Sequence, residues 1–164
     1  MKPSRANHLV LAACLMLPGA VAAQSAPALL DAYARAIALL NYMTTYVGES
    51  LLACAEKNVL TEAQAETRFQ AYRARNAALL ERAETWRQEV EKRLRTQGEE
   101  RAAGQRAEEA GMSAMMAASA RAQGEIGKAG DVRAICGARF AGIESGRYDL
   151  SGNAEFVDLL RANP

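Results

Sequence analysis

The feature that most constrains this chain is a long apolar stretch between Ala28 and Ala55, which has the pattern of a buried helix. No charged residue occurs between Arg35 and Glu49. A helix that is apolar around so much of its circumference is expected at the centre of a helical protein. We therefore predict an all-α antiparallel bundle of about four helices, organised around this one. Its large residues recur at the three-and-four spacing of a helix seam, at Leu30, Tyr33, Ile37, Leu40, Thr44, Val47, Leu51 and Cys54.

The first 23 residues have the layout of a secretory signal peptide rather than of folded structure. Lys2 and Arg5 precede an apolar run over residues 9–17, and a series of small residues follows. This order of charged, apolar and small residues is typical of a cleaved export signal. We predict cleavage between Ala23 and Gln24, which leaves a single helical domain over 24–164.

A lipoprotein signal is the alternative interpretation of the same segment. Residues 11–14 read Leu-Ala-Ala-Cys, a pattern that would lipidate Cys14 and anchor the protein in a membrane. The apolar core before Cys14 would then be shorter than the roughly 7–15 residues expected of an export signal. The apolar run also continues beyond Cys14. We therefore expect a periplasmic or secreted protein without a membrane anchor.

The charge balance of the predicted mature chain limits its partners. Residues 24–164 carry 18 basic and 19 acidic side chains. A chain so close to neutrality lacks the basic surface that nucleic acids and anionic lipids attract. Over the full sequence arginine outnumbers lysine 16 to 4, which suggests a GC-rich bacterial genome. We expect no nucleic-acid partner.

A second long helix is predicted after a short turn, and it is strongly amphipathic. Thr61 and Gln64 have the spacing of a capping box, and apolar residues then recur at helical spacing as far as Val90. A turn this short makes consecutive helices antiparallel. Matching the two seams outward from the turn places Tyr33 beside Trp86.

Beyond Gly98 the chain becomes rich in alanine and glycine. The second helix either continues as one rod or breaks between Gly98 and Gly104 and turns back. A single rod as far as Gln123 would span roughly 90 Å, and we favour the break. Asp131 is expected to cap the next helix, and a short C-terminal helix completes the chain.

Histidine and cysteine usage excludes much catalytic chemistry. The only histidine, His8, lies in the predicted signal, which excludes histidine-dependent nucleophiles and histidine-ligated metals or haem. No Cys-x-x-Cys motif occurs. We therefore predict no catalytic residue, no metal ligand and no cofactor. Cys54 and Cys136 remain after cleavage, and two cysteines in an oxidising compartment most often form one disulfide.

An enzyme based on carboxylates alone is the remaining catalytic alternative. Asp31 and Glu49 lie on the otherwise apolar first helix. Their spacing places them on one face but about 27 Å apart, which is too far for an acid/base pair. Both are expected at the rim of the core.

A small polar cluster is predicted within the first helical hairpin. The expected register brings Thr44 and Asn41 opposite Asn76. We interpret them as a hydrogen-bonded core pair that keeps the two helices in register. The alternative interpretation is a cluster that binds a small ligand inside the bundle.

Three methionines, Met112, Met115 and Met116, are the concentrated flexible apolar residues outside the core helices. We interpret them as residues that fill gaps in the bundle, and the alternative is an adaptable docking surface for another protein. Two classes of function follow from the sequence. The favoured one is a non-enzymatic protein that binds another secreted or envelope protein, as an inhibitor, immunity factor, chaperone or accessory subunit. The alternative is a small-ligand binder or carboxylate enzyme with a pocket inside the bundle.

Overall fold

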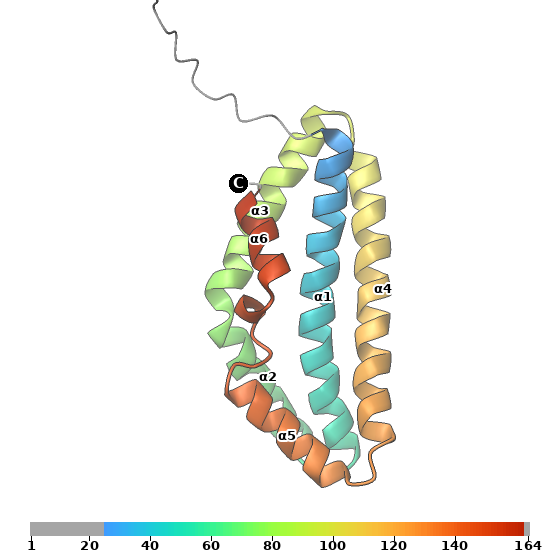
Figure 1. Ribbon diagram of the computed structural model, residues 1–164, viewed down its shortest axis with the longest axis vertical. Coiled ribbons are helices and arrows are strands. Elements are labelled where there is room, and N and C mark those ends of the chain that lie inside the picture. The colour runs from blue at the N-terminus through green and yellow to red at the C-terminus, as the bar shows by residue number, and fades with distance from the viewer. Residues whose placement is uncertain (1–24, 163–164) are drawn as a thin grey trace, which may run out of the picture.

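The computed structural model describes residues 25–162, and these residues form helices and no strand (Figure 1). The all-α prediction is confirmed, but the expected count of about four helices is wrong because the described residues form six α-helices. The predicted signal peptide and its cleavage site lie outside the described residues. In chain order the elements are α1 (Ala26–Glu56), α2 (Glu62–Arg75), α3 (Ala77–Thr96), α4 (Glu100–Gly127), α5 (Val132–Glu144), the 3-10 turn η1 (Leu150–Gly152) and α6 (Ala154–Ala162).

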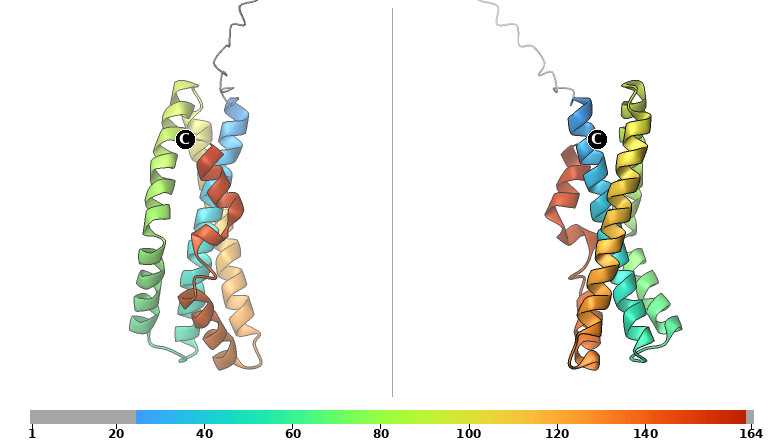
Figure 2. Two further views of the ribbon diagram at one scale, coloured as in Figure 1. Left: turned by 60° about the vertical axis from the view of Figure 1, so that its left-hand side comes forward. Right: turned by 90° about the vertical axis from the view of Figure 1, so that its right-hand side faces the viewer.

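The chain runs back and forth along the long axis of the molecule. It descends through α1, returns through α2 and α3, descends again through α4 and returns through α5 and α6 (Figures 1 and 2). Helices α1 and α4 are therefore parallel neighbours. Helix α1 contacts each of the other five helices, so the apolar stretch is the centre of the fold, as predicted. None of the helices within 25–162 is long and apolar enough to cross a membrane.

The predicted second helix is divided at Asn76 into α2 and α3. Asn76 ends α2 and also precedes the first residue of α3, with φ −94° and ψ 4°. Its side-chain Nδ2 donates to the carbonyl oxygen of Tyr72 at 2.8 Å. Such a bond from an asparagine side chain competes with the regular backbone ladder. The single long amphipathic helix was a wrong prediction at this point.

Helices α1, α3 and α5 end in the same kind of turn, with one residue in the left-handed conformation. The residues are Asn58 with φ 56°, Gly98 with φ 78° and Gly146 with φ 79°. After α3 the amide of Glu99 donates to the carbonyl of Leu94 at 2.8 Å, the bond of a Schellman motif. The predicted break after Gly98 is therefore confirmed. At the start of α2, the predicted capping box between Thr61 and Gln64 is also present.

Helix α4 approaches α1 closely because its facing residues are small. A Cβ atom on Gly111 would lie 2.6 Å from Nδ2 of Asn41 and 3.4 Å from Cγ2 of Ile37. Ser119, two turns further along α4, hydrogen-bonds Glu49 of α1. Both pairs are 70 positions apart in sequence, so the two helices keep one register over this length. The fully buried residues of α4 are Ala103, Gly111, Ala118, Ala122 and Ile126.

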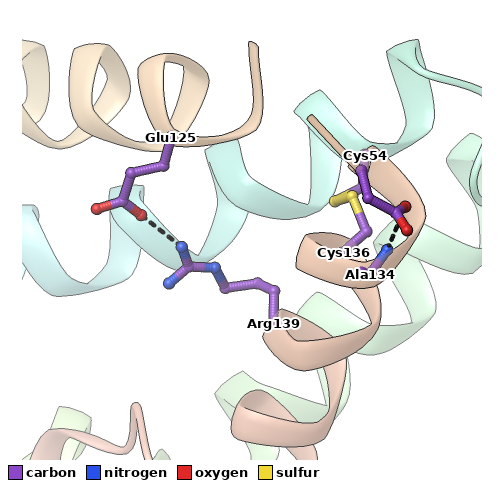
Figure 3. The surroundings of a disulfide bond; sticks show 6 residues. Cys54, Glu125, Ala134, Cys136 and Arg139 are labelled. Atoms are coloured by element: carbon purple, nitrogen blue, oxygen red, sulfur yellow. Dashed lines mark hydrogen bonds and ion pairs between the residues drawn. A yellow bond between two sulfur atoms is a disulfide. The ribbon is translucent and has the colours of Figure 1, made fainter. Parts of the chain in front are cut away.

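The predicted register of the first hairpin and the predicted disulfide are both present. The rings of Tyr33 and Trp86 are stacked with their centroids 6.2 Å apart. Cys54 at the end of α1 is bonded to Cys136 of α5, with 5.9 Å between their Cα atoms (Figure 3). Both cysteines are buried. The bond holds α5 against the lower end of α1, while the short C-terminal helix α6 packs against α1 and α3.

Candidate functional site

The three methionines singled out in the sequence lie on the surface of α4 and do not fill the core. Met112 is 53% exposed, Met115 47% and Met116 68%. The core-facing stripe of α4 consists mostly of alanine and glycine, so no gap beside α1 is left for them. Leu52 of α1, which is 49% exposed, is the other exposed large apolar side chain of residues 25–162.

The methionines and Leu52 lie on one flank of α1. Met112 and Met116 are seven and three residues from Ser119, so all three share one stripe of α4. Ser119 donates to the carboxylate of Glu49 at 3.1 Å. Glu49 in turn lies three residues before Leu52 in α1. The methionine stripe therefore runs beside the α1 surface that carries Leu52.

An apolar groove of about 500 Å³ continues this flank between α1 and α2. The ring of Phe69 packs over α1 at Gly48, where a Cβ atom would lie at an ordinary contact distance of 3.5 Å from the ring. The views in Figure 2 show α2 and α4 on either side of the C-terminal part of α1, at the lower end of the molecule. We call the methionine stripe and this groove together the apolar flank. The groove is lined by Gly48, Leu51, Leu52, Glu62, Ala63, Ala65, Glu66 and Phe69.

The predicted core polar pair does not form. The hydroxyl of Thr44 donates to the carbonyl of Leu40 at 2.8 Å, and Asn41 faces Gly111 of α4. The Asn76 side chain instead accepts from the amide of Leu150 at 2.8 Å. The break between α2 and α3 turns Asn76 toward the loop before η1 and away from Thr44.

The two carboxylates of α1 contact separate positions on α4. Asp31 accepts a bond from Arg106 at 2.5 Å. Glu49 accepts from Ser119 at 3.1 Å and from Gln123 at 3.2 Å. Each carboxylate thus joins α1 to α4, and the two are not brought together as an acid/base pair. Residues 25–162 contain no group of three or more side chains arranged to hold a metal ion.

A second cavity, of about 480 Å³, lies where α1, α4, α5 and the η1 region meet. Sequence reasoning missed it. Its Arg121 is nine residues from Met112 on α4, so the two side chains point about 180° apart. The cavity is therefore on the flank opposite the methionines, and we call it the Tyr–Arg pocket. Its lining residues include Tyr42, Met43, Tyr46, Val47, Arg121, Glu125, Arg139, Arg147, Tyr148 and Asp149.

Glu125 is the central acceptor of the Tyr–Arg pocket. It accepts from Nε of Arg121 at 2.8 Å, from the hydroxyl of Tyr46 at 2.6 Å and from the guanidinium of Arg139 (Figure 3). The hydrogen bond from Arg121, followed by those from Tyr46 and Arg139, lowers the pKa of Glu125 to about 2. Burial and the bond to Glu125 raise the pKa of Tyr46 to about 12. Glu125 is therefore ionised and Tyr46 neutral at neutral pH.

Arg139 is the buried cation of the Tyr–Arg pocket, with only 8% of its surface exposed. Its guanidinium carbon lies 4.7 Å from the ring centroid of Tyr46 and 5.2 Å from that of Tyr148. Burial lowers the pKa of Arg139, but Tyr46, Tyr148 and Glu125 outweigh burial, and the net pKa is raised. The four-residue spacings of Tyr42 with Tyr46 and of Arg121 with Glu125 were the sequence signals for this cluster. Nothing local to either pair showed that the two helices place them together.

Comparisons of the chain with protein-family models, with curated proteins and with solved structures each find no match. The functional assignment therefore rests on the chain's own geometry.

Proposed function

We propose that this is a non-enzymatic protein that binds another secreted or envelope protein through its apolar flank. The observation that carries the proposal is that all four exposed large apolar side chains of residues 25–162 lie on this flank. Contiguous exposed apolar surface is characteristic of interaction sites. The predicted signal over residues 1–23 supports a periplasmic or secreted location.

The side chains of this flank are suited to binding a protein surface. Methionine is unbranched and polarizable, so Met112, Met115 and Met116 can adapt to the shape of a partner. The helix that carries them is held rigidly against α1 by small residues. Burial of the exposed apolar surface would favour a complex through the hydrophobic effect.

The charges beside the groove indicate the chemistry of the partner. The two acidic side chains Glu62 and Glu66 line it, and no basic side chain does. A complementary partner would place an apolar segment on Leu52 and Phe69, with lysine or arginine beside the two glutamates. Inhibitors, immunity factors, chaperones and accessory subunits all act by presenting such surfaces.

A pull-down from periplasmic extract with variants of matched charge tests this function. The wild type is expected to recover one protein in stoichiometric amount, and Leu52→Asp and Met112→Asp are expected to lose it. Both positions are exposed, so neither change should lower the melting temperature by more than a few degrees. Ala117→Asp introduces the same charge at an exposed position of α4 that is at least about 100° around the helix from each of the three methionines, and it should retain the partner. Equal recovery by all four proteins would contradict a role for the apolar flank.

A further inference from the structure

The Tyr–Arg pocket has the chemistry of a second binding site, independent of the apolar flank. We propose that it binds a small molecule that carries a carboxylate or phosphate group on a planar, aromatic body. This inference goes beyond the proposed protein-binding function. It rests on an excess of hydrogen-bond donors and on the aromatic rings that surround them.

The two carboxylates of the pocket are already satisfied by protein groups. Glu125 accepts from Arg121, Tyr46 and Arg139. Asp149 accepts from Nε of Arg75 at 3.2 Å and from Nδ2 of Asn76 at 3.2 Å. Neither carboxylate is left to attract a cation, because each is neutralised by an arginine.

Several donors of the pocket, by contrast, have no acceptor among residues 25–162. The Tyr42 hydroxyl accepts from Arg121 at 3.0 Å, and the Tyr148 hydroxyl accepts from Arg139 at 2.8 Å. A phenol that accepts a bond still has its own proton to donate, and neither proton has an acceptor within the described structure. The exposed guanidinium of Arg147 lines the same cavity and has no hydrogen-bond or ion-pair partner there either.

Arg139 adds a buried positive charge to these donors. Its Nε atom is buried and has no hydrogen-bond partner among the described residues. This atom has almost no accessible surface, so Arg139 attracts an anion through its charge and not through a free hydrogen bond. A ligand with two or three oxygen acceptors and a negative charge matches the donors of Tyr42, Tyr148 and Arg147.

The rest of the lining selects for a ring attached to the oxyanion. The Tyr42 and Tyr46 rings lie 6.1 Å apart and nearly parallel, at an interplanar angle of 6°. Tyr148 meets Tyr46 edge to face at 6.0 Å, and Met43 and Val47 add apolar surface. A cavity of about 480 Å³ is within the range of sites for small metabolites. Benzoate and phenyl phosphate are therefore suitable probes.

Isothermal titration calorimetry of the full chain with these two probes tests the proposal. At least one is expected to bind with one-to-one stoichiometry, and the tighter of the two identifies the oxyanion. Arg147→Gln should weaken binding about tenfold or more, because a charged hydrogen-bond donor is lost. Tyr42→Phe keeps the ring but removes the phenol proton and should weaken binding several-fold. Leu52→Asp, on the other flank, should leave binding unchanged, which separates this test from that of the proposed function.

Arg133→Gln is the matched control, because Arg133 is an exposed arginine of α5 outside the pocket and without a partner within the described structure. Unchanged affinity in this variant supports a specific site. An equal loss in Arg133→Gln and Arg147→Gln would show general charge attraction and overturn the proposal. Absence of binding by both probes would overturn it as well. Inorganic phosphate that binds as tightly as phenyl phosphate would overturn the assignment of a ring-bearing ligand.

Discussion

At the scale of single residues, Asn76 links the break between α2 and α3 to the C-terminal part of the chain. Its side chain donates to Tyr72 and Asp149 and accepts from the buried amide of Leu150. These contacts extend across 74 positions of sequence to reach Leu150. One amide side chain thus determines both where the helix breaks and where the later loop is attached.

Asn76→Ala is expected to lower the free energy of unfolding by about 2–3 kcal/mol, because it leaves the buried amide of Leu150 without an acceptor. Urea denaturation measures the change. Thr44→Val provides the comparison, because Thr44 bonds only its own helix. The double variant should be additive to within about 0.5 kcal/mol. A larger deviation from additivity would show that Thr44 and Asn76 interact, as the sequence-based register had predicted.

Glu125 makes the stability of the folded protein depend on pH in the acid range. Its folded pKa is about 2, below the roughly 4.3 of a glutamate in an unfolded chain. The stabilisation of the fold by the ionised Glu125 is therefore fully present above about pH 4.3 and is lost as the pH falls toward 2. Glu125→Gln should be less stable than wild type at pH 6, and this difference should shrink progressively below pH 4.

Thermal unfolding at a series of pH values measures this effect, with Glu108→Gln as the control. Glu108 lies on the exposed surface of the same helix, so this substitution makes the same charge change outside the pocket. A difference between wild type and Glu125→Gln that stays constant from pH 6 to pH 2 would contradict the ionised, hydrogen-bonded Glu125.

At the scale of helices, α4 depends on small residues on one face and not on the other. A Cβ atom on Gly104 would meet nothing within 4 Å, whereas one on Gly111 would lie 2.6 Å from the Asn41 side chain. Both glycines are inside the same helix and carry the same cost in helix propensity. Because their surroundings differ, substitutions at the two positions distinguish the effect of helix propensity from that of packing.

Gly104→Ala should raise the free energy of unfolding by about 0.5–1 kcal/mol, since alanine is the better helix former. Gly111→Leu should lower it by about 1–3 kcal/mol, because the added side chain forces α4 away from α1. Gly104→Leu is the control for the change in residue type and should not destabilise. Chemical denaturation of the three variants distinguishes these cases, and equal effects of leucine at both positions would contradict the close α1–α4 contact.

At the scale of the whole molecule, the Cys54–Cys136 disulfide joins the first helix to the fifth across 82 positions. It closes the lower end of the fold, where α5 has a smaller contact with α1 than α4 has. The bond also holds the segment that carries Arg139 and Arg147 beside the Tyr–Arg pocket. Loss of the bond is therefore expected to affect both stability and the pocket.

Cys54→Ala/Cys136→Ala should lower the free energy of unfolding by about 4 kcal/mol, mainly because the unfolded chain gains freedom. Dithiothreitol should bring the wild type to the stability of the double variant and should leave the double variant unchanged. Urea denaturation with and without reductant measures both effects. Equal stability of the oxidised wild type and the double variant would contradict a structural role for the bond.

Features that depend on neighbours within a turn or two could be predicted from the sequence alone. The period of Leu30, Tyr33 and Ile37 identifies the central helix, since burial on one side repeats with the helical turn. The Thr61–Gln64 capping box and the Gly98 turn need only the backbone groups nearest to them. The disulfide was predicted because removal of the expected signal leaves two cysteines, and these pair in an oxidising compartment such as the one we expect.

Only the tertiary structure decided the features assembled from distant parts of the chain. The break at Asn76 was missed because the helical period of apolar residues continues through this position. Nothing in that period shows that the Asn76 side chain accepts a hydrogen bond from the distant Leu150. Tyr42 and Arg121 are 79 positions apart, and they meet because α4 packs parallel to α1 in one register. The exposure of the methionines has the same origin. Small residues occupy most of the contact with α1, so the three methionines of α4 are directed to the surface.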